Sequence, residues 1–145
     1  MNTTTEVLLV DDNPADLDLI REVLARMGHA ARIHSVMDGA QAIAFLRHQG
    51  KFSDMPAPDF VLLDLNLPCK DGRAVLAEVK TDPVLRKVPI TIFSTSGAEQ
   101  DILSSYQLGA NCYVSKPGNL NDFIAVVSSL GEFWLGCARL PRKED

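Results

Sequence analysis

Residues 60–72 read FVLLDLNLPCKDG, and this stretch gives the clearest indication of the architecture. Its first four residues are an unbroken apolar run, as expected for a strand that is buried on both faces of a parallel sheet. The run ends at Asp64, and Pro68 and Gly72 then mark a loop before a helical pattern begins. Open parallel sheets bind ligands at the carboxyl ends of their strands, so Asp64 is expected to lie in a binding site.

Two other apolar runs end in charged residues in the same way. Residues 7–10 lead into Asp11 and Asp12, and residues 111–115 lead into Lys116. The three acids and the lysine are therefore expected to meet at one edge of the sheet, although they are far apart in sequence. Clustered carboxylates repel one another, and Mg2+ suits such a site because it prefers oxygen ligands. A lysine beside the cation would attract an anionic substrate group, so the combination indicates phosphoryl transfer.

Apolar runs of strand length alternate with segments of helical periodicity, which is typical of an α/β fold with a parallel sheet. The expected strands cover residues 6–10, 31–36, 59–64, 89–94 and 111–115. The expected helices cover residues 14–27, 39–49, 72–81, 98–108 and 119–135. This alternation predicts a doubly wound, five-stranded parallel sheet of the flavodoxin-like (βα)5 type. We expect one domain over residues 1–136 and a charged tail over residues 137–145.

The composition limits the classes of function. The chain has 145 residues, with 14 Lys and Arg against 19 Asp and Glu, a net charge of −5. It has no basic stripe, which argues against direct nucleic-acid binding. No apolar stretch is long enough to span a membrane, and the N-terminus lacks the basic segment of a signal peptide. The three cysteines are widely spaced and suggest neither a metal site nor a disulfide framework, so we expect a cytoplasmic protein.

The charged and polar strand ends also have simpler structural interpretations. A single aspartate at position 11 or 12, just before Pro14, would be a helix cap, whereas an acid pair opposite a third acid favours metal binding. Asp64 at a strand tip can act as a nucleophile that forms an acyl phosphate. The backbone carbonyl of Asn66 is well placed as a further metal ligand. Ser94 ends the fourth strand, where its hydroxyl either bonds to a phosphoryl oxygen or belongs to a loop that caps the next helix.

These motifs occur in the order and spacing of response-regulator receiver domains of two-component signalling, which the chain resembles over roughly its first 130 residues. The signature comprises the acid pair, the pattern Asp-x-Asn-x-Pro-x-x-Asp-Gly from residue 64, the strand-end hydroxyl and the Lys-Pro at residue 116. The resemblance implies that Asp64 accepts the phosphoryl group and that Asp11 and Asp12 hold Mg2+. It implies further that Lys116 pairs with the phosphoryl group.

The same resemblance implies roles outside the acidic cluster. Ser94 would be the switch hydroxyl that moves toward the phosphoryl group, and Tyr113 would be the aromatic residue that turns inward with it. Residues 80–89, 94–96 and 132–134 resemble stand-alone regulators that pair with bacterial and cyanobacterial phytochrome kinases. The resemblance therefore implies a single-domain response regulator whose partner is a sensor histidine kinase. Such a protein is not an enzyme beyond catalysing its own phosphorylation and dephosphorylation.

The last expected helix carries more apolar residues than one buried face requires. Phe123, Val127, Leu130 and Trp134 form one stripe, and further apolar residues, Phe133 among them, widen it. The excess is either ordinary core or an exposed patch that binds a partner. We expect a homodimer, or an equivalent contact with the kinase, through the fourth helix, the fifth strand and the fifth helix, with Phe133 and Trp134 at its edge.

Two other functions stay open at this point. One is a phosphorylation-independent adaptor, which the complete set of acids, hydroxyl and lysine disfavours. The other is a phosphatase with an aspartyl nucleophile. Such enzymes often carry a second acid two residues after the nucleophile, but Asn66 stands at that position here. Turnover of a generic phosphate monoester would distinguish a phosphatase from a receiver.

Overall fold

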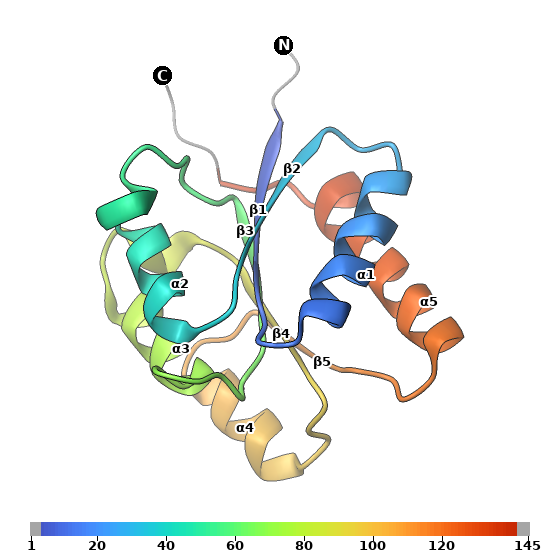
Figure 1. The fold of residues 1–145 in the computed structure, drawn as a ribbon. Coiled ribbons are helices and arrows are strands. Elements are labelled where there is room, and N and C mark those ends of the chain that lie inside the picture. The colour runs from blue at the N-terminus through green and yellow to red at the C-terminus, as the bar shows by residue number, and fades with distance from the viewer. Residues whose placement is uncertain (1–3, 142–145) are drawn as a thin grey trace.

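The computed structural model describes residues 4–141 and contains five parallel strands in the order β2-β1-β3-β4-β5 (Figure 1). The strands are β1 (Thr5–Val10), β2 (Ala31–Val36), β3 (Phe60–Leu63), β4 (Ile90–Ser94) and β5 (Cys112–Ser115). Every residue of β1, β3 and β4 is buried, in agreement with their largely apolar sequences. The strand order is that of the flavodoxin-like class, so the predicted fold is confirmed.

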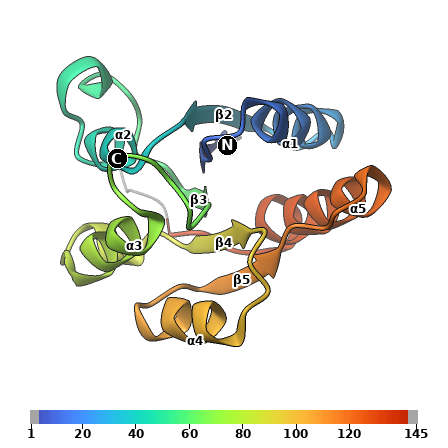
Figure 2. The ribbon, with the colours of Figure 1, turned by 60° about the horizontal axis from the view of Figure 1, so that its bottom comes forward.

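Five α-helices cover the two faces of the sheet (Figure 2). They are α1 (Pro14–Arg26), α2 (Gly39–Leu46), α3 (Gly72–Thr81), α4 (Glu99–Gln107) and α5 (Leu120–Gly131). Helices α1 and α5 lie side by side on one face, where Ile20 and Val127 share a buried cluster with Phe93. Helices α2 and α3 pack on the other face, where Phe45 and Leu76 belong to a second cluster. Successive residues of the central strands enter these two cores alternately, because side chains along a strand point to opposite faces.

The order of the strands creates a crevice beside β1. After β2 is placed on one side of β1, the chain crosses to the other side and adds β3, β4 and β5. Val10 at the end of β1 is aligned with Leu63 at the end of β3. The carboxyl ends of these two strands therefore lie next to each other at the switch in winding direction, where doubly wound sheets bind their ligands.

The second helix is shorter than the sequence predicts. It ends at Leu46 rather than at residue 49, because His48 adopts a left-handed backbone conformation with φ of 57°. A short 3₁₀ turn, Gly50–Phe52, follows in the connection to β3. The remaining expected elements agree with the structure to within a few residues at their ends.

The chain continues beyond α5 as a π-helical segment, Glu132–Cys137. Trp134 in this segment stacks on Phe60 with the ring centroids 4.8 Å apart, and Leu140 packs against the same core. The boundary that we expect between the domain and its tail, after residue 136, therefore lies inside this helical segment. The extent of the domain stays a prediction. The last part of the expected charged tail, residues 142–145, lies outside the described residues.

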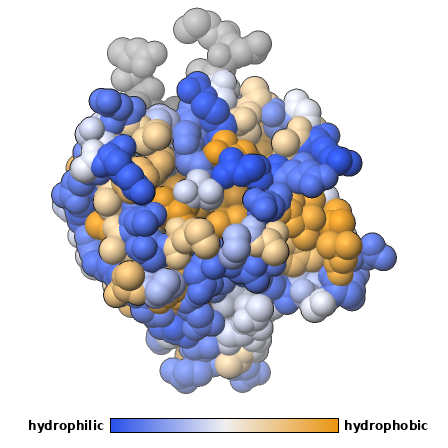
Figure 3. Space-filling view, viewed as in Figure 1, coloured by the Kyte–Doolittle hydropathy of each residue, from blue (hydrophilic) through white to orange (hydrophobic). Residues whose placement is uncertain are grey.

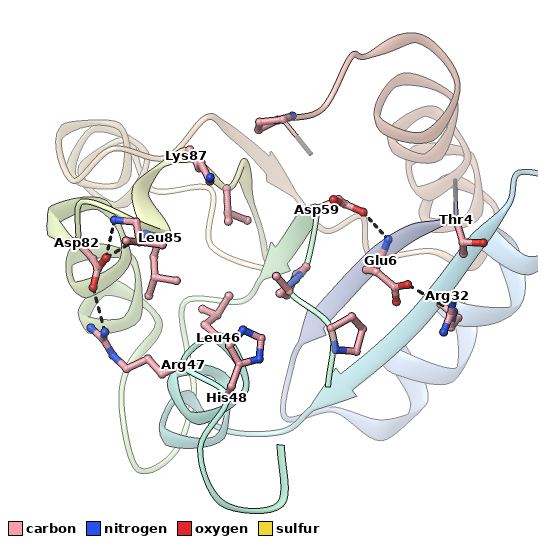
Figure 4. A pocket seen from close by; sticks show the side chains of 16 residues that line it. Thr4, Glu6, Arg32, Leu46, Arg47, His48, Asp59, Asp82, Leu85 and Lys87 are labelled. Atoms are coloured by element: carbon pink, nitrogen blue, oxygen red, sulfur yellow. Dashed lines mark hydrogen bonds and ion pairs between the residues drawn. The ribbon is translucent and has the colours of Figure 1, made fainter. Parts of the chain in front are cut away.

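A cavity of about 790 Å³ opens at the amino-terminal edge of the sheet (Figure 4). Glu6 at the start of β1 and the residues that precede β3 line it, so it lies at the edge opposite the carboxyl ends of the strands. Arg32 pairs with Glu6 at 3.5 Å, and Arg47 pairs with Asp82 at 3.0 Å. Much of the charge around this cavity is thus balanced within the protein, and the predicted site residues do not line it.

The surface seen from the direction of Figure 1 is mainly polar. Apolar side chains gather on the right of this view, over α1 and α5 (Figure 3). Within residues 4–141, none of the helices combines the length and the apolar character that crossing a membrane requires.

Candidate functional site

Three carboxylates meet at the carboxyl edge of the sheet. Asp11 and Asp12 follow β1, and Asp64 follows the neighbouring strand β3. One oxygen of each carboxylate lies within 4.8 Å of the others. Asp11 and Asp64 are buried, whereas Asp12 is exposed and opens the cluster to solvent. A set of three oxygen donors with one open side fits a hard divalent cation that keeps part of its water shell.

Lys116 enters the same site from the end of β5. Its ammonium group donates to Oδ2 of Asp11 at 2.6 Å, of Asp16 at 2.9 Å and of Asp64 at 2.9 Å. The side chain is only 4% exposed. Its backbone N–H donates to the carbonyl of Ser94 at 2.7 Å, which ties the base of the side chain to β4. The sequence-based expectation that a strand-end lysine joins the acids is therefore borne out in the geometry.

Burial and charge act against each other in this cluster. Burial raises the pKa of Asp11 above its ordinary value, although hydrogen bonds from Lys116 and from the Asn13 backbone oppose the change. Burial alone would lower the pKa of Lys116, but its hydrogen bonds to three carboxylates outweigh burial and raise the pKa. Lys116 is therefore protonated at neutral pH, and one ammonium faces several acids. A bound cation would relieve the excess of negative charge.

Both oxygens of the Asp64 carboxylate are oriented by hydrogen bonds. Oδ1 accepts from the backbone N–H of Asn66 at 3.1 Å, and Oδ2 accepts from Lys116. The loop that follows folds back tightly, because a Cβ at position 72 would lie 2.2 Å from the carbonyl oxygen of Asp64. Only glycine allows α3 to begin so close to the strand. Asn66 itself is exposed, and its carbonyl as a metal ligand stays a prediction.

Ser94 and Tyr113 lie beside the acidic cluster and are linked through one loop. Ser94 ends β4, the neighbour of β3, and is completely buried; its hydroxyl oxygen accepts from the Ser96 N–H at 3.4 Å. The hydroxyl of Tyr113 donates to the Ser96 carbonyl at 2.8 Å. Tyr113 is half-buried against the core, so its ring already points toward the β4–α4 loop. The structure therefore connects the two predicted switch residues through Ser96.

Two features of the site were not predicted from the sequence. Asp16 in the first turn of α1 is a third partner of Lys116, although an acid near a helix start is usually explained by the helix dipole. Asp101 in α4 accepts from Arg73 of α3 at 2.7 Å and from the Ser96 hydroxyl at 2.6 Å. The Ser96 bond and then the Arg73 guanidinium hold the pKa of Asp101 below its ordinary value. Nothing local in the sequence signals these contacts between distant elements.

A buried lysine among acids, at the switch point of a five-stranded parallel sheet, is the arrangement expected of a phosphoacceptor domain. The chain belongs to the response regulator receiver domain family, whose profile matches residues 7–128. It is 43% identical to response regulator Rcp1 from Synechocystis sp. over 140 residues, which are 97% of this chain and 95% of Rcp1.

Solved structures of such regulators are closely similar to this one. The Mn2+-bound form of Rcp1 matches with a TM-score of 0.93, 43% identity and coverage of 95% of this chain and 99% of that one. The phosphorylated cyanobacterial phytochrome response regulator RcpA matches with a TM-score of 0.93 and 46% identity, covering 97% of this chain and all of RcpA. The resemblance to receiver domains, and within them to phytochrome response regulators, is thus confirmed.

Proposed function

We propose that this chain is a response regulator that accepts a phosphoryl group from a sensor histidine kinase onto Asp64. The observation that carries the proposal is the Asp64 carboxylate, which one hydrogen bond from the Asn66 backbone and one from Lys116 hold beside Asp11 and Asp12. In the transfer, an Asp64 oxygen attacks the phosphorus of a phosphohistidine. The P–N bond breaks, the histidine leaves, and an acyl phosphate forms on Asp64.

The residues around Asp64 have distinct roles in this proposal. Asp11, Asp12, Asp64 and the carbonyl of Asn66 would hold Mg2+, which would neutralise charge on the transferring phosphoryl oxygens. The Mn2+-bound form of Rcp1 supports a divalent cation in such a site. We favour Mg2+ because all the donors here are oxygens. Lys116 would exchange its bond to Asp64 for one to a phosphoryl oxygen, since its ammonium is already directed at that carboxylate.

The output of the proposed switch lies on α4, β5 and α5. Ser94 would move toward the phosphoryl group and take the β4–α4 loop with it, and Tyr113 would follow through its bond to the Ser96 carbonyl. A ligand that binds one of two surface arrangements more tightly shifts the equilibrium between them. Phosphorylation therefore need not create a new surface, because a change in affinity for a partner is enough.

An apolar groove of about 630 Å³ between β5 and the end of α5 supports a partner contact on this face. Val114, Val126 and Phe133 line it, and Phe133 is 54% exposed. Trp134 also lines the groove, but it stacks on Phe60 and so is anchored in the core. Phe133 meets the Trp134 ring edge-on, with the centroids 5.0 Å apart. We propose a homodimer or kinase contact in which Phe133 inserts and Trp134 forms a fixed wall.

The phytochrome link rests on similarity rather than on the site. RcpA is a phytochrome response regulator, and this chain is 46% identical to it. We propose a phytochrome-type kinase as the phosphoryl donor and the cytoplasm as the location, which the three free thiols in the described chain support. The chain would act by binding proteins and would catalyse only its own phosphorylation and dephosphorylation.

The direct test is phosphotransfer from an autophosphorylated, radiolabelled phytochrome-type kinase. Label is expected to move to the wild-type chain and to Asp54→Asn, whose acid lies on an exposed turn. It should not move to Asp64→Asn. Equal labelling of Asp64→Asn would reject Asp64 as the acceptor, whereas a wild-type chain that takes up no label would favour the phosphorylation-independent adaptor. Sustained turnover of p-nitrophenyl phosphate would instead favour the phosphatase.

A further inference from the structure

Asp16 makes a contact in the site that the proposed phosphotransfer does not use. Its Oδ2 accepts from the Lys116 ammonium at 2.9 Å, the same distance as the bond to Asp64. An ammonium has three N–H donors, and Asp11 takes the third. With the lysine side chain 4% exposed, this buried cation is fully satisfied by three carboxylates.

The three carboxylates around Lys116 are not equivalent. Asp11 and Asp64 belong, with Asp12, to the group whose oxygens are close enough to share a cation, and Asp16 does not belong to it. When a cation and a phosphoryl group engage Asp11 and Asp64, their bonds to the lysine have to change. The bond to Asp16 is the one that can persist unchanged through the reaction.

The position of Asp16 is fixed by the start of α1. Its backbone N–H donates to Oδ1 of the helix-capping Asn13 at 3.2 Å. The next residue, Leu17, is buried between the helix and the sheet. The Asp16 carboxylate, 23% exposed, therefore projects from a rigid helical turn rather than from a loop. Such support is what a side chain needs if it is to hold another group in place.

From this geometry we propose that Asp16 is a positioning residue for Lys116. It holds the ammonium in the site while Asp64 exchanges its lysine bond for the phosphoryl group. The ammonium is therefore already in position to bind the phosphoryl oxygens when they arrive. The inference deepens the proposed function and rests on it. Asp16 does not touch the phosphoryl group in this scheme, and its effect reaches the reaction only through Lys116.

The test compares Asp16→Ala, Asp16→Asn and Asp18→Ala. Asparagine keeps an oxygen that accepts from Lys116 but removes the charge, whereas alanine removes both. Asp18 is exposed on the same helix and is not among the three carboxylates that bind the Lys116 ammonium, so its replacement controls for lost charge alone. Urea unfolding of each variant establishes that it is folded under the conditions of the assay.

The first readout needs neither cation nor phosphodonor. A buried, hydrogen-bonded lysine ammonium exchanges its protons slowly, so its ¹H–¹⁵N signal is expected in wild type and should be absent in Lys116→Arg, which assigns it. The signal should persist in Asp18→Ala and Asp16→Asn and broaden beyond detection in Asp16→Ala. A sharp, slowly exchanging signal in Asp16→Ala would overturn the proposal.

The second readout is the initial rate of phosphorylation at varied acetyl phosphate concentration. Asp16→Ala should lower the maximal rate about ten-fold, because one charge-assisted hydrogen bond to the lysine is lost. Asp16→Asn should recover most of it, and Asp18→Ala should match wild type. If Asp16→Asn and Asp16→Ala had equally low maximal rates, or if only the acetyl phosphate concentration at half-maximal rate changed, Asp16 would act through its charge. Either result would overturn the proposal. Failure of the underlying function is separate, since it would appear as labelling of Asp64→Asn.

Discussion

Replacing Gly72 by alanine is expected to disturb the phosphoacceptor site, because the added Cβ would clash with the backbone at the end of β3. A Cβ at this position would lie 2.2 Å from the Asp64 carbonyl oxygen, 2.7 Å from Cα of Leu65 and 2.9 Å from the Leu65 carbonyl oxygen. All three neighbours are backbone atoms, which cannot rotate away as a side chain can. Ordinary contact begins near 3.4 Å, so α3 and the end of β3 must separate by about 1.2 Å.

That displacement sets the size of the expected effects. Overpacking of this kind typically destabilises a protein by about 1–3 kcal/mol, and urea unfolding should show a loss in this range for Gly72→Ala. A misplacement of about 1 Å in a reacting group lowers rates about 100-fold. The initial rate of phosphorylation by acetyl phosphate, measured on the folded variant, should fall by about this factor, because the displacement of the strand end moves the Asp64 carboxylate.

Gly118→Ala is the matched control for this experiment. It makes the same change in the loop after Lys116, but its Cβ would have no neighbour within 4 Å. We expect wild-type stability and wild-type phosphorylation from it. Wild-type behaviour of Gly72→Ala as well would show that the strand end tolerates the added Cβ without moving the carboxylate, contrary to this prediction.

Three further changes test separate parts of the structure. Asp12→Ala should abolish Mg2+ binding in a calorimetric titration without lowering cation-free stability, because it relieves repulsion among acids; a strong loss of stability would show that the acid is structural. Thr91→Val should raise the unfolding free energy by about 1 kcal/mol, since this buried hydroxyl lacks a hydrogen-bond partner within residues 4–141, whereas Thr81→Val, which loses a bond to the Ala77 carbonyl, should not. The pKa of Asp101 is lowered, so the stabilisation that it provides should be complete above its unfolded pKa near 3.8 and disappear as the pH falls through the lower folded value. The stability difference between wild type and Asp101→Asn should therefore shrink in acid, and a difference that grows below pH 4 would contradict this sign.

The sequence predicts the fold and the centre of the site for a common physical reason. Strands buried on both faces must be apolar throughout, so a charged residue that ends such a run is conspicuous. Asp11 and Asp64 are found in this way, and the topology of a parallel sheet then brings Lys116, at the end of the half-buried edge strand β5, to the same edge. The side chains do meet, with Lys116 bonded to Asp64 at 2.9 Å.

The contacts that escape prediction depend on tertiary packing. Asp16 has the sequence appearance of an ordinary acid in the first turn of a helix, and only the folded chain shows that it faces Lys116. Trp134 and Phe133 are adjacent and both aromatic, yet one stacks on Phe60 and the other is largely exposed. The π-helical turn that separates their environments has no local signature in the sequence.

Intact-mass spectrometry after incubation with acetyl phosphate and Mg2+ shows most directly whether Asp64 is the phosphoacceptor. We expect the addition of one phosphoryl group to wild type and to the control Asp54→Asn, removable by hydroxylamine as an acyl phosphate should be. We expect no addition to Asp64→Asn, and none to wild type in the presence of a chelator. Addition of a phosphoryl group to Asp64→Asn at the wild-type rate would mean that another residue is the phosphoacceptor.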